Sequence, residues 1–105
     1  MSEPFARPNA PLCIVLLTYD APLDAIDAAM KDHVAWLATG YDQGVILMSG
    51  RQVPRTGGAI IFRGDEDSVE AVVATDPFVV QGLATTRIVA FTASMAARDL
   101  ADLLG

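Results

Sequence analysis

The segment Leu12-Cys-Ile-Val-Leu-Leu-Thr-Tyr19 is an unbroken apolar run that includes β-branched residues. Such a run predicts a strand that is buried on both faces or that lies in the centre of its sheet. The residues Asp20-Ala-Pro-Leu23 come directly after it and mark the start of a helix, because proline is tolerated in the first helical turn. The folded part of the chain is therefore expected to begin with a strand followed by a helix.

This helix is expected to run to about Asp42 and to present one apolar face. The positions on that face recur with the 3.6-residue period of an amphipathic helix, and they are Ile26, Met30, His33, Leu37 and Tyr41. Asp24 and Asp27 lie near the positive end of the helix dipole, where acidic side chains are stabilising. Gly44 is the expected stop at the C-terminal end.

A hairpin is expected next. Its strands are Val45–Val53 and Ala59–Arg63, and Pro54-Arg-Thr-Gly-Gly58 forms the turn, with glycines able to adopt positive φ. Ser49-Gly50 interrupts the first of these strands, and a glycine within a strand often marks a bulge or a close backbone approach.

A second helix is expected to open at Gly64-Asp-Glu-Asp67. Asp67 and Glu70 have the spacing of a capping box, and the apolar face comprises Val69, Val72 and Val73. Asp76-Pro77 ends the helix, because a residue before proline is disfavoured in the α region. Thr85 to Thr92 is the fourth strand, and Ser94 to Leu104 is a short C-terminal helix.

The predicted order is β-α-β-β-α-β, which is the ferredoxin-like split βαβ arrangement of an α+β protein. Two helices on one face of a four-stranded sheet leave the other face in need of a cover. We expect a homodimer in which two sheets face each other. The length of 105 residues indicates one domain, with a flexible lead-in at 1–11, a folded part at 12–93 and a helical tail at 94–105.

Composition excludes several classes of function. The net charge is −6 and the few basic residues are scattered, which disfavours binding to nucleic acid or to anionic lipid. No apolar run is long enough to span a bilayer, and the N-terminus lacks the apolar region of a secretory signal, so a cytoplasmic location is expected. One cysteine and one histidine are too few for a structural zinc site. The count leaves open an all-carboxylate site for a hard cation, but the ten aspartates lack the regular spacing of an EF-hand. We expect no metal and no cofactor.

His33, the single histidine, lies within the apolar face of the first helix. One interpretation is a core histidine whose ring is hydrogen-bonded to a backbone carbonyl, because an unpaired buried imidazole is costly. The other is a general acid or base in a cleft.

Asp76 falls on the extended apolar face of the second helix, so its carboxylate is expected to point into the layer that contains His33. A carboxylate that accepts from one ring nitrogen fixes the tautomer and leaves the other nitrogen free to move a proton. The alternative is that Asp76 only caps a turn before proline.

Further candidates lie near the expected mouth of this site. Ser49 and Gly50 are candidates for ligand contact, and Arg51 or Arg55 could bind a carboxylate in a bidentate manner, although a solvated arginine is the alternative for each. Tyr19, at the end of the first strand, could reach the same mouth, and the alternative is that it only packs there. Cys13 is expected to be an inert core thiol, and Trp36 a core or dimer contact.

Several short motifs occur in a fixed order: Cys13-Ile-Val-Leu-Leu-Thr-Tyr19, His33-Val-Ala-Trp-Leu37, Gly44-Val-Ile-Leu-Met-Ser-Gly50, Gly57-Gly58, Asp76-Pro-Phe78 and Arg87-Ile-Val-Ala-Phe91. Together they resemble the YCII-related (YciI-like) family over about residues 12 to 93. The resemblance implies a ferredoxin-like, dimeric α+β barrel fold. It also implies a pocket with a His–Asp pair, which corresponds to His33 and Asp76, with Ser49 beside them.

The resemblance also implies a class of reaction, because a few YCII-like proteins act as dehydrochlorinases or isomerase-like lyases on degradation products of aromatic compounds. Our first hypothesis is a cofactor-independent enzyme that uses His33 and Asp76 for proton transfer on a small carboxylic acid or lactone, with an anionic ligand held near Ser49. The alternatives are a non-catalytic homodimer that binds a metabolite in the same pocket, and a structural homodimer in which the pair is a buried polar contact.

Overall fold

The centre of the fold is β2 (Ala10–Tyr19), which lies between two antiparallel neighbours in a four-stranded sheet. The computed structural model describes residues 3–104. The strand order is β3 (Ile46–Arg51), β4 (Gly57–Arg63), β2 and β5 (Ala84–Ala93). This is the order of the ferredoxin-like split βαβ arrangement, which confirms the predicted fold class.

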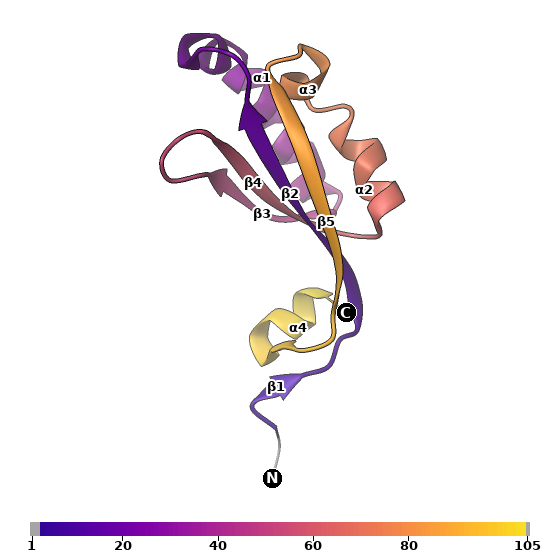
Figure 1. Ribbon diagram of the computed structural model, residues 1–105. Coiled ribbons are helices and arrows are strands. Elements are labelled where there is room, and N and C mark those ends of the chain that lie inside the picture. Colours follow the sequence, from indigo (N-terminus) through magenta and orange to yellow (C-terminus); the bar gives the residue numbers. More distant parts are fainter. Residues whose placement is uncertain (1–2, 105) are drawn as a thin grey trace.

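Helices cover one face of this sheet (Figure 1). They are α1 (Leu23–Asp42), α2 (Glu66–Val73) and the short α3 (Pro77–Val80). Alternate residues of β2, including Val15 and Leu17, are buried in one core cluster with residues of α1 and α2. Hydrophobic burial on this face contributes most of the favourable free energy of folding. None of the helices described is both long enough and apolar enough to cross a membrane.

The opposite face of the sheet has no helix over its centre. The residues of β2 that point to it, Ile14 and Leu16, are only partly buried, and their cross-strand neighbour Val89 is exposed. Phe91 and Met48 are also exposed on this side. We call this surface the open face.

A terminal arm, residues 3–9 and 94–104, projects from one end of the sheet (Figure 1). In it, β1 (Phe5–Ala6) pairs with β6 (Ala96–Ala97), and α4 (Arg98–Leu104) follows. The first strand of the sheet begins at Ala10 rather than Leu12, and the tail helix begins at Arg98 rather than Ser94. Residues 1 and 2 of the expected lead-in, and residue 105 of the tail, lie outside the described part of the chain.

Two predictions about helix α2 need correction. The capping residue is Asp65, whose carboxylate accepts from the backbone N–H of Ser68, and not Asp67. The helix ends at Val73, and Asp76 instead caps α3 by accepting from the backbone N–H of Phe78. Asp76 therefore does cap a turn before proline, as one of the two interpretations held.

The glycines of the hairpin also differ from expectation. Gly50 pairs regularly with Ala59, and the irregularity in β3 lies between Ile46 and Met48. Gly57 and Gly58 do not have positive φ and belong to β4. Gly57 is needed for space, because a Cβ there would lie 1.7 Å from the carbonyl oxygen of Leu17.

Candidate functional site

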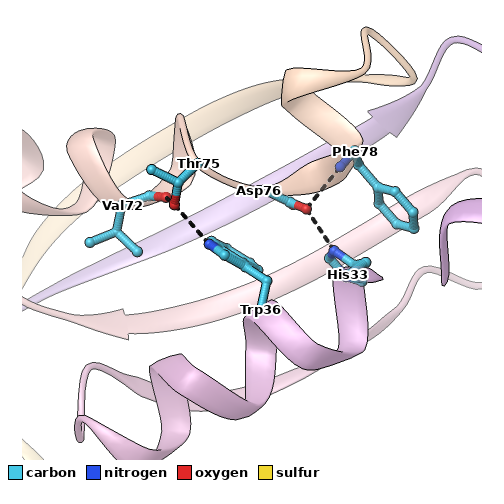
Figure 2. A network of polar contacts seen from close by, with 6 residues as sticks. All are labelled: His33, Trp36, Val72, Thr75, Asp76 and Phe78. Carbon is cyan, nitrogen blue, oxygen red and sulfur yellow. Dashed lines mark hydrogen bonds and ion pairs between the residues drawn. The ribbon is translucent and has the colours of Figure 1, made fainter. Parts of the chain in front are cut away.

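His33 and Asp76 are joined by a hydrogen bond across the interface of α1 with α3. Nδ1 of His33 donates to Oδ1 of Asp76 over 2.8 Å (Figure 2). The side chain of Asp76 is fully buried, and that of His33 is 12% exposed. The structure therefore brings together the two residues expected to form a pair, and the ring is held with Nδ1 towards the carboxylate.

Local sequence explains why Asp76 points this way. Pro77 fixes the backbone dihedral at the first position of α3, and Asp76 adopts the extended conformation of an N-cap. Its Oδ1 accepts both from His33 and from the backbone N–H of Phe78, at 2.8 and 3.0 Å. Oδ2 is buried and has no hydrogen-bond partner within residues 3–104. The carboxylate is thus held from two sides through one oxygen.

Aromatic rings hold the imidazole in place. The ring of Phe78 stacks on His33 with a centroid distance of 4.0 Å and an interplanar angle of 7°. Trp36 lies on the same helix one turn later, 5.8 Å from the imidazole between ring centroids. Its indole N–H donates to Oγ1 of Thr75 over 2.9 Å (Figure 2). Side chains from two successive turns of α1 are therefore hydrogen-bonded to the neighbouring residues Thr75 and Asp76. These bonds hold the α2–α3 connection against α1.

A cavity of about 150 Å³ lies beside His33, between α1 and the sheet. Its walls are mainly apolar and include Leu17, Met30, Val34, Leu37 and Ile60. Within residues 3–104 the ring of His33 is hydrogen-bonded through Nδ1, and Nε2 makes no hydrogen bond. A cavity of about 150 Å³ with apolar walls accommodates a molecule the size of one six-membered ring.

All four residues expected to contact a ligand, Tyr19, Ser49, Gly50 and Arg51, line this cavity. Ser49 is hydrogen-bonded to the hydroxyl of Tyr41 near the end of α1, with 2.6 Å between the two oxygens. The lining contains Arg51 and no carboxylate, so its formal charge is positive at neutral pH. An arginine at such a site favours an anionic group on the ligand.

Arg55, the other candidate for binding a carboxylate, is occupied by one from this chain. Its Nη2 donates to Oδ1 of Asp27 over 2.5 Å, and its guanidinium lies 6.0 Å from the ring centroid of Tyr19. The hydrogen bond from Arg55 holds the pKa of the Asp27 carboxyl below its usual range. Arg55 therefore fastens the β3–β4 turn to α1 beside the cavity.

Some members of the site were not singled out from sequence. In the sequence, Phe78 stands out only as part of the Asp-Pro-Phe motif and Tyr41 only as part of a helix face. No sequence pattern points to Thr75. Each contact joins residues from separate elements, so no local pattern reveals it.

Cys13 is buried away from the cavity. Burial is the main cause that raises the pKa of its thiol, and the negative charges of Glu66 and Asp65 raise that pKa further. No group of three or more potential metal ligands occurs among residues 3–104.

Comparisons with known proteins identify the family and support the fold. The model of the YCII-related domain matches residues 12–92. Comparison with curated protein sequences gives no match. Among solved structures, the chain is similar to 5-chloro-2-hydroxyhydroquinone dehydrochlorinase from Burkholderia phenoliruptrix, in complex with 2,5-dihydroxybenzoquinone. The TM-score is 0.62 with 23% identity, over 74% of this chain and 90% of that one, which is a likeness of fold.

Proposed function

Since this chain belongs to the YCII-related domain family, we propose that it is a small-molecule enzyme of the lyase or isomerase type that works without a cofactor. The observation that carries the proposal is the orientation of His33. Its Nδ1 is anchored to the fully buried Asp76, and its ring lines an apolar cavity. A histidine oriented in this way can take a proton from a ligand through Nε2 and return it elsewhere.

In this mechanism His33 is the general base and acid, and Asp76 is the positioning residue. Asp76 fixes the proton on Nδ1, and its carboxylate lies beside the imidazolium that forms when Nε2 accepts a proton. The parallel ring of Phe78 supports the imidazolium further, because a cation is attracted to an aromatic face. The apolar walls limit water around the reacting centre, which strengthens these interactions.

The size and charge of the cavity support a small anionic molecule as the substrate. A ring or short chain of about six carbons fills the space, and Arg51 binds a carboxylate or ionised hydroxyl at the mouth. Ser49 donates a hydrogen bond to a second oxygen when its own oxygen accepts from Tyr41. A small carboxylic acid or lactone with an acidic C–H bond meets these requirements. A chlorinated hydroxyhydroquinone, on which the structurally similar dehydrochlorinase acts, is a second type to test.

The test is solvent exchange in deuterated buffer. The purified protein is incubated with such acids, lactones and hydroxyhydroquinones, and the loss of each ligand's C–H signal is followed by proton NMR. A positioned base contributes about 10²–10⁴-fold, so His33→Gln should slow exchange by at least about 100-fold. Thr39→Val, on α1 but outside the lining of the His33 cavity, is the control and should exchange at the wild-type rate.

Each outcome is informative. Equal rates for wild type and His33→Gln would refute the mechanism. A ligand that shifts the His33 ring signals but neither exchanges nor converts would instead favour the alternative of a metabolite-binding protein. With a single histidine in the chain, those signals need no assignment.

We further propose that the protein is a homodimer joined through the open face. An apolar surface on β2 and the edge strand β5 is only partly covered within the described chain, and it comprises Ile14, Leu16, Val89 and Phe91. A sheet with helices on only one face commonly buries its other face against a second layer. Sedimentation equilibrium tests the dimer, and a monomer at all concentrations would refute it.

A further inference from the structure

The terminal arm lies largely outside the part of the chain that matches the family, which is residues 12–92. It also makes the molecule unusually long. The radius of gyration is 15.0 Å, whereas about 13 Å is typical of a compact domain of this length. Figure 1 shows the reason, because β1, β6 and α4 extend beyond the end of the four-stranded sheet. The arm is therefore an addition to the fold that needs its own explanation.

The arm lies on the side of the open face. Residues at alternate positions of β2 point to this face, and their burial changes along the strand. Ala10 and Leu12, nearest the arm, are buried outside the main core cluster, whereas Ile14 and Leu16 are only partly buried. In Figure 1, α4 lies beside the lower part of the β2–β5 ribbon, away from α2. The arm thus closes one end of the open face.

Helix α4 has apolar side chains that the described chain covers only in part. Leu100 is 44% exposed and Leu103 is 56% exposed, and they lie three residues apart on one face of the helix. No residue of α4 is buried. A helix this short is marginal in water without packing, so α4 gains stability if a further surface covers these leucines.

Charges on the two surfaces are complementary. Arg63 and Arg87 pair with Leu12 and Leu16 in the sheet register and so belong to the open face. Asp99 and Asp102 lie on α4. Within residues 3–104 none of these four residues forms an ion pair. In a symmetric dimer the same contact forms twice, once from each copy. The aspartates of each α4 would therefore pair with the arginines on the open face of the other copy.

We propose that α4 extends the homodimer interface, with Leu100 and Leu103 of one copy packed on the open face of the second copy. Asp99 and Asp102 then lie towards the arginines on the open face of that copy. This assignment rests on the homodimer proposed above, but it does not depend on the reaction at His33. The partner that fits the arm is a second copy of this chain, because the open face supplies both the apolar surface and the opposite charge.

The test is sedimentation equilibrium of the full chain and its variants. Leu100→Glu/Leu103→Glu should raise the dimer dissociation constant at least about tenfold, because charged side chains in the buried part of an interface are unfavourable. Val53→Glu/Val80→Glu is the matched control, since it adds the same charge at positions 96% and 69% exposed on other elements. This control should leave the dissociation constant unchanged.

A charge exchange provides a second measurement. Asp102→Arg and Arg87→Asp should each weaken the dimer, and the combined variant should recover at least part of the loss. A dimeric wild type whose dissociation constant is unchanged by the α4 variants would overturn the role of α4 and leave the open-face dimer standing. A monomeric wild type would overturn both. Circular dichroism shows whether each variant is folded. If Leu100→Glu/Leu103→Glu does not fold, the charge exchange tests the role of α4 by itself.

Discussion

A double-mutant cycle between His33 and Asp76 measures the interaction on which the proposed function depends. The bond joins Nδ1 to Oδ1 over 2.8 Å, and the carboxylate is fully buried, so the distance is that of a charge-assisted hydrogen bond. Hydrogen bonds to charged groups contribute about 1.5–3 kcal/mol to stability. We expect His33→Ala and Asp76→Ala each to destabilise the fold. The double variant should lose about 1.5–3 kcal/mol less than the sum of the two.

Urea denaturation followed by the fluorescence of Trp36 gives these free energies, provided that the m-values of the variants agree. Asp76→Asn is the conservative control, because an amide oxygen can still accept from His33 and from the backbone N–H of Phe78. Neutral hydrogen bonds are about half as strong as charge-assisted ones, so this variant should lose about 1 kcal/mol. A coupling energy within about 0.5 kcal/mol of zero would refute the pairing of the two residues in solution.

Three other predictions follow from local geometry. Gly57→Ala should destabilise the fold by more than about 2 kcal/mol, because the added Cβ would lie 1.7 Å from a backbone oxygen. Gly50→Ala is the control, because the space around its Cβ is open, and it should leave thermal denaturation nearly unchanged. The pKa of Asp65 is lowered by the backbone hydrogen bond that it accepts at the start of α2. Its contribution to stability is therefore present at neutral pH and is lost as the pH falls through that pKa. In Asp65→Asn, the free energy of unfolding should fall less steeply as the pH is lowered. The pKa of Cys13 is raised by burial, so its thiol should react with a disulfide reagent only after unfolding, and a fast reaction in the native protein would contradict this.

The elements with long periodic patterns were predictable from sequence. The apolar run at β2 and the 3.6-residue period of α1 identified both elements, because burial of one face dominates their free energy. The order of elements then determined the sheet topology. Glycine was less informative. Gly57 was read as a turn residue with positive φ, yet it is required because β4 passes close to the backbone of β2, and only the paired strands reveal that approach.

The candidate site was predictable to the same extent. His33 and Asp76 were expected to meet because each lies on the apolar side of its own segment, and the structure places them in one hydrogen bond. The contacts that support them were not predictable. The bond between Tyr41 and Ser49 and that between Trp36 and Thr75 join elements that are separate in sequence. The position of the arm likewise depends on the pairing of β1 with β6, which involves segments at opposite ends of the chain.

The free energy needed to bury the His33–Asp76 pair bears on the role of the pair. Burying a carboxylate is expensive, and the attraction of a single partner often fails to repay that cost. Here Oδ2 is buried and accepts a hydrogen bond from no group within the described chain. An apolar pair of similar volume would serve the packing between α1 and α3 at least as well. A pair that stabilises the fold no better than apolar residues would, yet orients an imidazole in the wall of a cavity, supports the catalytic role proposed for His33.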